Sequence, residues 1–99
     1  MAYTPAYHPD VAARDLPLID RRQQGSIETA IRERLLSAPE KFGEPLRRDL
    51  AGHRKLRVGD YRVIYRVVGR EVWILAIMNR KVAYRRVGPR VGWKKAGVQ

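Results

Sequence analysis

The chain of 99 residues contains no cysteine. This absence excludes disulfide bridges, thiol nucleophiles and thiolate metal sites together. Histidine is scarce as well: His8 and His53 are the only two, and neither has a partner at the spacing of metal ligands. We therefore predict a protein that holds no metal ion and needs no cofactor.

A long hydrophobic run is also missing. The longest apolar stretch, residues 72–78, is much too short to span a bilayer. Residues 1–5 have neither the basic start nor the apolar stretch of a signal peptide. These features predict a cytoplasmic protein without a membrane partner. With 44% hydrophobic residues, the chain has enough apolar side chains for one small folded domain.

Acidic residues are scarce in only one part of the chain. Residues 1–43 hold six Lys or Arg and six Asp or Glu, so their charges cancel. Residues 44–99 hold fifteen Lys or Arg and four Asp or Glu, and they carry the whole net charge of +11. Solubility does not require such a split. A polyanionic partner explains it, because each neutralised phosphate releases condensed counterions. Charge alone does not select among RNA, DNA and an acidic protein.

Two helical patterns come first in the chain. Residues 11–16 predict a short helix that ends before Pro17. A longer helix begins near Asp20, where Asp20 and Gln23 stand at capping-box spacing. Its apolar residues recur at helical intervals and predict one buried stripe, formed by Ile27, Ala30, Ile31, Leu35 and Leu36. Pro39 ends this helix, and a polar linker follows up to Gly52.

After Gly52 the pattern changes to the period of a β-strand. Three successive antiparallel strands are predicted over residues 53–58, 61–68 and 71–79. Residues 3–7 predict an edge strand, since Pro5 cannot donate to a central ladder. The pattern therefore predicts an α+β fold in which two N-terminal helices pack on a small antiparallel sheet of about four strands. We expect one domain over residues 1–86 and a basic, flexible tail over residues 87–99.

The first two of these strands carry cations at every second position. Lys55 and Arg57 share one face of their strand, and Arg62 and Arg66 repeat the pattern on the next. Such a surface suits a phosphate backbone. The cations of this half that we expect to contact RNA are Arg54, Arg57, Arg66, Lys81, Arg85 and Arg86. The alternative is a solvated strand face.

Few catalytic groups are available on the basic half. It has no carboxylate pair at a useful spacing, no serine or threonine and no metal cluster. The side chains that remain for chemistry are His53, Lys55, Arg57, Arg62, Arg80, Lys81 and Tyr84. Cations stabilise charge that develops on a phosphate, and RNA supplies its own nucleophile, the 2′-hydroxyl. This set fits metal-free cleavage of RNA and does not fit hydrolysis of DNA.

These residues also resemble a known family. The string LRVGDYRVIY at residues 56–65, with residues 43–47, residues 50–52, Arg80 and Tyr84, is similar to the RelE/ParE superfamily of bacterial toxins. The resemblance covers roughly residues 3 to 86. It implies a RelE-like fold, related to microbial ribonucleases, and a toxin held inactive by a cognate antitoxin.

The RelE branch of that superfamily enters the ribosomal A site and cleaves mRNA there by attack of the 2′-hydroxyl on the adjacent phosphate. The resemblance implies that Lys55 acts on the 2′-hydroxyl or the phosphate, and that Arg62 holds the scissile phosphate. It also implies that Arg80 assists there and that Tyr84 stacks on a base. His53 stands where some members carry a second lysine, and it is a candidate proton shuttle.

Each of these residues also has a structural interpretation. The cations are compatible with surface ion pairs, His53 with an exposed strand end, and Tyr84 with core packing. Our hypothesis is a metal-independent endoribonuclease that acts on translated mRNA and binds ribosomal RNA. The alternatives are a ParE-like, non-enzymatic inhibitor of DNA gyrase and an RNA-binding module without toxicity. Codon preference and the identity of the antitoxin do not follow from the sequence.

Overall fold

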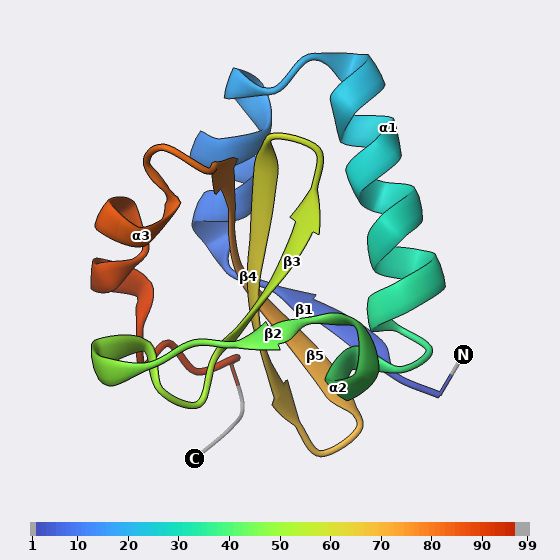
Figure 1. The fold of residues 1–99 in the computed structure, drawn as a ribbon, viewed down its shortest axis with the longest axis vertical. Coiled ribbons are helices and arrows are strands. Elements are labelled where there is room, and N and C mark those ends of the chain that lie inside the picture. Colours follow the sequence, from blue (N-terminus) through green and yellow to red (C-terminus); the bar gives the residue numbers. More distant parts are fainter. Residues whose placement is uncertain (1, 97–99) are drawn as a thin grey trace.

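A computed structural model describes residues 2–96, and its centre is a mixed five-stranded sheet (Figure 1). The strands lie in the order β1-β5-β4-β3-β2. Their bounds are Thr4–Tyr7 for β1, Glu44–Pro45 for β2, Arg54–Val58 for β3, Tyr61–Val68 for β4 and Glu71–Asn79 for β5. β1 runs parallel to β5, and the other neighbours are antiparallel.

The predicted α+β class and the three successive strands are confirmed, but the sheet differs from the prediction in two respects. It has five strands rather than four, because Glu44 and Pro45 pair with Lys55 and Arg54 within the expected linker. It is mixed rather than antiparallel, because β1 lies parallel to β5. A two-residue strand that contains proline gives no alternation, so the sequence pattern could not reveal β2.

The long helix begins where the capping pattern predicted. The Asp20 carboxylate accepts a hydrogen bond from the Gln23 backbone N–H at 2.9 Å. The helical segments are η1 Val11–Asp15, η2 Leu16–Leu18, α1 Arg21–Ala30, η3 Ile31–Leu35, α2 Pro39–Phe42, η4 Arg48–Leu50, α3 Ala83–Arg86 and η5 Gly88–Arg90. Pro39 opens α2, because a first helical turn leaves its N–H groups unpaired in any case. None of the helices described is long and apolar enough to cross a membrane.

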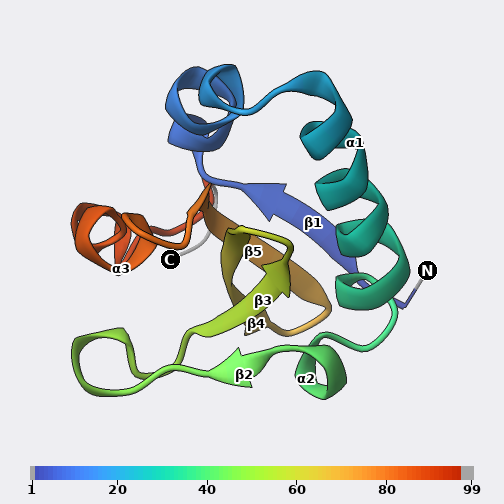
Figure 2. The same cartoon turned by 45° about the horizontal axis from the view of Figure 1, so that its top comes forward.

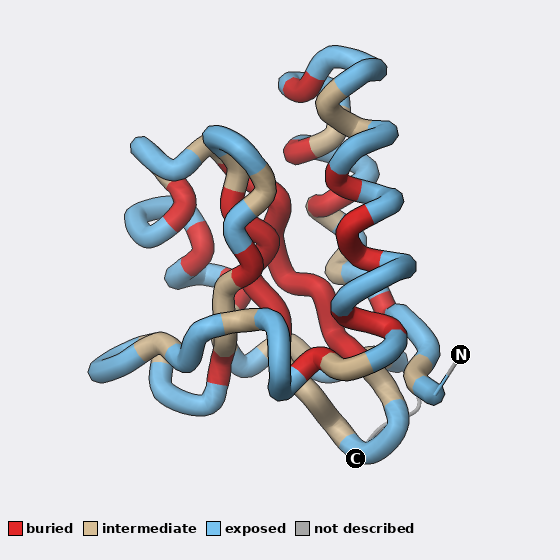
Figure 3. The backbone as a smooth tube through the Cα atoms, turned by 45° about the vertical axis from the view of Figure 1, so that its right-hand side comes forward, coloured by how far each residue is buried: buried red, intermediate tan, exposed pale blue. Residues whose placement is uncertain are grey.

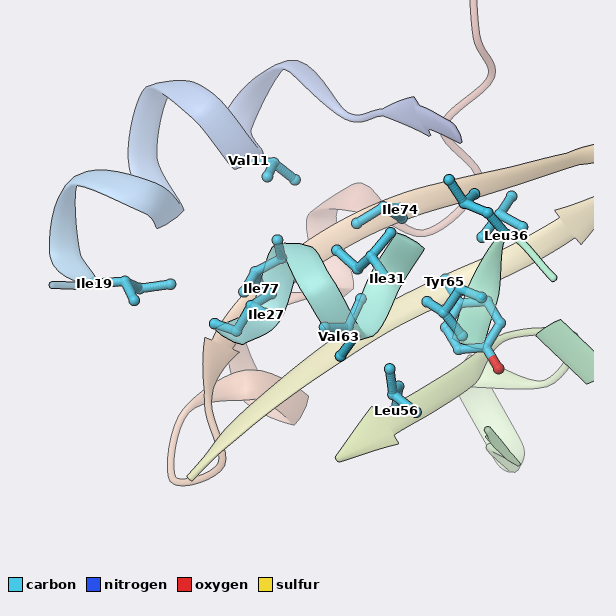
Figure 4. Close-up of a cluster of buried hydrophobic side chains, with 13 residues drawn as sticks. Val11, Ile19, Ile27, Ile31, Leu36, Leu56, Val63, Tyr65, Ile74 and Ile77 are labelled. Carbon is cyan, nitrogen blue, oxygen red and sulfur yellow. The ribbon is translucent and has the colours of Figure 1, made fainter. Parts of the chain in front are cut away.

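Both faces of β5 are buried, as its apolar sequence predicted, and they belong to two clusters of core side chains. The first cluster lies between the sheet and the long helix and includes Val63, Tyr65 and Ile74 (Figure 4). The second lies on the opposite face and includes Ile64 and Trp73. Figure 2 shows α1 and α3 on opposite sides of the sheet, and Figure 3 shows buried positions on the sheet and on the inner side of α1.

A buried ion pair satisfies the backbone of a bulge in β5. The register with β4 skips Leu75, which is left without a partner. Arg90 donates to the Leu75 carbonyl at 2.9 Å, and the Ile77 backbone N–H donates to Asp15 at 2.9 Å. Asp15 and Arg90 also bond to each other at 2.7 and 2.9 Å, and they are only 4% and 7% exposed. Because β1 pairs with β5 no further than Ile74, these two side chains complete the open edge.

Residues 87–96 pack on the domain, which differs from the flexible tail expected from composition. Val87 is buried in the second core cluster. Trp93 lies edge-on to Trp73, with ring centroids 5.4 Å apart. The boundary predicted before this segment therefore falls within packed structure. Glycine and charged residues dominate the segment, so its few anchoring side chains left no periodic signal. Residues 97–99 of the predicted tail lie outside the described residues.

The buried pair predicts a large cost for removing one partner. Asp15→Ala removes the hydrogen-bonded counter-charge of the buried Arg90 guanidinium and leaves it only the Asp10 carboxylate at 3.8 Å. We therefore expect the free energy of unfolding in urea to fall by about 3 kcal/mol. Arg14→Ala removes the ion pair between the exposed Arg14 side chain and Asp10, whose nitrogen and oxygen are 3.8 Å apart. This variant should change the free energy of unfolding by less than about 1 kcal/mol. Equal losses in the two variants would contradict a central role for the buried pair.

Candidate nucleic-acid interface

A groove of about 210 Å³ lies beside β3. β2 pairs only with Arg54 and Lys55, so the rest of this edge of β3 is not covered by another strand. The groove is lined by Arg34, Phe42, Glu44, Lys55, Leu56, Arg57 and Arg62. Four of these side chains are cations and one is a carboxylate, so the groove is a positive site suited to an anion.

The strand register places two cations directly opposite each other. Arg57 of β3 pairs with Arg62 of β4, so both side chains leave the sheet on the face that also carries Lys55. Arg62 donates to the carbonyls of Gly59 at 3.2 Å and Tyr61 at 3.0 Å, which holds its guanidinium near the turn. Like charges at opposed positions repel each other. An anion bound between the two arginines would relieve this repulsion.

Lys55 connects the groove with β2 and α3. Its ammonium nitrogen lies 3.8 Å from the Glu44 carboxylate and 5.5 Å from the centroid of the Tyr84 ring. Tyr84 stays 41% exposed, so part of its ring is free to stack on a ligand. The fold therefore brings two of the predicted residues, Lys55 and Tyr84, into contact. Sequence reasoning missed Glu44, because only the pairing of β2 with β3 places it beside Lys55.

A larger cleft of about 680 Å³ lies between η1 and α3. Arg85 and Arg86 line it together with His8 and Arg90, and none of its lining residues lines the groove beside β3. Burial, followed by the nearby charge of Arg90, lowers the pKa of His8. The predicted RNA contacts Arg85 and Arg86 therefore belong to a different surface from Lys55. Within residues 2–96, no three His, Asp or Glu side chains gather closely enough to hold a metal ion.

Comparison with known proteins identifies the family. A sequence model of the ParE toxin of the type II toxin–antitoxin system parDE matches residues 9–84. The chain belongs to this toxin family. The matched range contains every residue of the groove beside β3 as well as Tyr84. The resemblance of the sequence to the RelE/ParE superfamily is thereby confirmed.

Related toxins agree with this assignment. The chain is 37% identical over 76 residues to Toxin RelE of Mycobacterium tuberculosis, a match that covers 75% of this chain and 78% of the relative. A chain in the crystal structure of the toxin–antitoxin complex RelBE2 from the same organism matches with a TM-score of 0.73 and 32% identity, covering 81% of this chain and 100% of that chain. YafQ from E. coli shares the fold, with a TM-score of 0.60, 17% identity and coverage of 83% and 98%.

Two of the predicted site residues that lie outside the groove, Arg54 and His53, are packed against the body of this toxin. Arg54 occupies the sheet face opposite to Lys55 and donates to the carbonyls of Glu40 at 2.9 Å and Gly43 at 2.7 Å. His53 is only 5% exposed, although a strand end was expected to be exposed, and its Nδ1 has no hydrogen-bond partner among the described residues. The structure therefore gives Arg54 a packing role and places His53 away from the solvent.

Three other predicted residues of the toxin lie outside the groove but remain accessible. Arg80 and Lys81 follow β5 at the end of the sheet where β3 turns into β4, and the Arg80 backbone N–H donates to the Asp60 carbonyl at 2.8 Å. Both side chains are exposed. Arg66 lies on the same face of β4 as Arg62 and is half-buried. RNA contacts by these residues stay predictions.

The structure separates a packing arginine, Arg54, from an exposed, groove-lining arginine, Arg57, on the same strand. Arg54→Ala leaves two backbone carbonyls without their donor and should lower the free energy of unfolding by about 1–3 kcal/mol. Arg57→Ala removes an exposed cation opposed by another and should change it by less than about 0.5 kcal/mol. Urea denaturation of both variants measures the difference. A loss for Arg57→Ala as large as that for Arg54→Ala would contradict this division.

Proposed function

We propose that this toxin is a ribosome-dependent endoribonuclease that cleaves mRNA in the A site without a metal ion. The observation that carries the proposal is the groove beside β3, where Lys55, Arg57 and Arg62 line the same space as the Glu44 carboxylate and Tyr84 packs on Lys55. Cations in such a place stabilise a phosphate in its transition state, and an exposed aromatic ring stacks on a base. The similarity to a protein named Toxin RelE supports this branch of the superfamily.

The reaction uses the 2′-hydroxyl of RNA as its nucleophile. The 2′ oxygen attacks the adjacent phosphorus, the bond from phosphorus to the 5′ oxygen of the next nucleotide breaks, and a 2′,3′-cyclic phosphate remains. Glu44 accepts the proton of the attacking hydroxyl, because it is the one carboxylate among the lining residues. Water supplies a proton to the departing 5′ oxygen. Arg57 and Arg62 stabilise the negative charge that grows on the phosphoryl oxygens.

The remaining predicted residues position the RNA. Lys55 orients the Glu44 carboxylate and contacts the phosphate, while Tyr84 stacks on a neighbouring base. Arg80 contacts the RNA from the end of the sheet that carries the turn between β3 and β4. His53 takes no direct part in proton transfer, because its imidazole is buried and does not line the groove.

The ribosome and an antitoxin are the partners in this proposal. The groove is lined mostly by exposed side chains, so we expect it to align free RNA poorly and to depend on the A site for in-line attack. The positive charge of residues 44–99 suits contacts with ribosomal RNA. The solved complex of a related toxin with its antitoxin supports a cognate antitoxin as a partner. We expect that antitoxin to cover the basic surface of this chain.

Three variants test the assigned roles. Because Arg62→Ala removes a group that stabilises transition-state charge, we expect cleavage to slow about 100-fold or more. Glu44→Gln removes the proton acceptor and should slow it by about 100-fold to 10,000-fold, whereas His53→Gln should retain most of the activity. The measurement is primer extension on stalled translation complexes, with rates taken from the appearance of A-site cuts.

Arg70→Ala is the matched control, because it removes an exposed cation from the β4–β5 turn, away from the groove. It should cleave at the rate of the unmodified toxin. The absence of A-site cuts with the unmodified toxin, or cuts that persist unchanged in Arg62→Ala and Glu44→Gln, would disprove the proposal.

Inhibition of DNA gyrase is the alternative function, and the description of the matching family as the ParE toxin favours it. A gyrase inhibitor needs the fold and its basic surface but no proton acceptor. Supercoiling by purified gyrase in the presence of the toxin separates the two functions. Under our proposal supercoiling continues at its normal rate, and inhibition at a toxin concentration that leaves mRNA intact would favour the alternative.

A further inference from the structure

Phe42 is the only phenylalanine of the chain, and it is not used in the core. It ends the short helix α2, stays 48% exposed and lines the groove beside β3. Large aromatic side chains usually contribute most by being buried. An exposed ring at the wall of a positive groove is therefore a candidate ligand contact.

The segment that carries Phe42 is held firmly by the body of the protein. The Tyr65 hydroxyl, at the edge of the first core cluster in Figure 4, donates to the Pro39 carbonyl at 2.5 Å. Arg54 donates to two further carbonyls of the segment, those of Glu40 and Gly43. Gly43 packs so tightly that a Cβ atom there would lie 1.9 Å from the Tyr65 hydroxyl. Phe42 is thus presented on a fixed support, which reduces the entropy cost of binding.

The surroundings of Phe42 are cationic rather than apolar. Arg34 reaches the groove from η3, is exposed and forms no salt bridge among residues 2–96. Arg57 lines the same groove from β3. The carboxylate of Glu44 is the opposing charge, and it lies 3.8 Å from the Lys55 ammonium group. An aromatic ring flanked by arginines matches a nucleotide, whose base stacks on the ring while its phosphate meets the cations.

We propose that Phe42 and Arg34 form a second nucleotide subsite, in which a base stacks on Phe42 and its phosphate contacts Arg34. Figures 1 and 2 place α2 and α3 on opposite sides of β3, so this subsite lies across the strand from Tyr84. The RNA strand thus crosses β3 from one aromatic ring to the other, with Lys55 between them. The inference rests on the proposed function, since it extends the RNA path of the same groove.

Single-stranded oligonucleotides with one missing base test the subsite directly. The probes are fluorescein-labelled 2′-O-methyl hexanucleotides, which lack the nucleophile, each with an abasic residue at a different position, and binding is followed by fluorescence anisotropy. For the unmodified toxin, one abasic position should weaken binding about five- to tenfold through lost stacking on Phe42. In Phe42→Ala the abasic residue at that position should weaken binding by less than about twofold. In Phe42→Trp it should again weaken binding as it does in the unmodified toxin.

Two further variants sharpen the result. In Tyr84→Ala an abasic residue at a different position should no longer weaken binding, because the Tyr84 ring lies across β3 from Phe42. Arg34→Gln should weaken every probe and reduce the salt dependence of binding by about one counterion. Arg32→Gln is its control, since Arg32 lies two residues earlier on η3, pairs with Glu28 and does not line the groove.

The outcomes separate this subsite from the proposed function. If no abasic position depends on Phe42, the subsite is wrong even where the unmodified toxin cuts mRNA. If Phe42-dependent stacking is found but no A-site cut occurs, the subsite stands and the nuclease proposal fails. A Phe42→Ala variant that binds all probes normally but loses affinity for its antitoxin would overturn the subsite and assign the surface to protein binding.

Discussion

The ion pair between Asp15 and Arg90 joins an early and a late segment of the chain to β5. It fixes η1 at one side, completes the edge of β5 at the bulge, and anchors η5. Through η5 it also retains α3, whose Ala83 is buried in the second core cluster. A buried charge without its partner is strongly destabilising, so we expect these segments to fold and unfold together. The position of Tyr84 beside Lys55 depends on this arrangement.

The groove beside β3 departs from the rules that the rest of the domain obeys. Arg57 faces Arg62, a like-charge pair that a sheet built for stability alone would avoid. Phe42 is exposed on a support fixed by Tyr65 and Arg54, whereas the side chains of the first core cluster are buried. Local conflicts of this kind concentrate at functional sites, where a ligand resolves them. The proposed RNA strand would resolve both, because one of its bases would cover the exposed ring and a phosphate would neutralise the paired arginines.

Much of the fold followed from local signals in the sequence. The Asp20 cap, the apolar stripe of α1, the turns after β3 and β4 and the buried run of β5 each have a period or a turn residue that predicts them. The missing parts depend on single long-range contacts. β2 is two residues long, and residues 87–96 are held by an arginine and a tryptophan at scattered positions. Contacts of this kind leave no periodicity to read.

The candidate site was predicted in part for the same reason. The alternation of Lys55 and Arg57 and the resemblance to the toxin superfamily led to the strand that lines the groove and to Tyr84 beside it. Charge alone, however, could not distinguish Arg54, which binds backbone carbonyls, from its neighbours. Glu44 and Phe42 lay in a segment without a pattern, and only the pairing of β2 with β3 and the anchoring of α2 bring them to the groove.

The separation of Asp15 and Arg90 along the chain also sets when the domain can be completed during synthesis. The two residues are 75 positions apart, and the first strand of the chain pairs with the last. Contacts of such long range form late and slow folding relative to local ones. During synthesis, Arg90 must emerge from the ribosome before it can complete the edge of β5 and hold α3 in place. Because Arg90 follows Tyr84 in the chain, Tyr84 is not held beside Lys55 until Arg90 has left the ribosome and paired with Asp15.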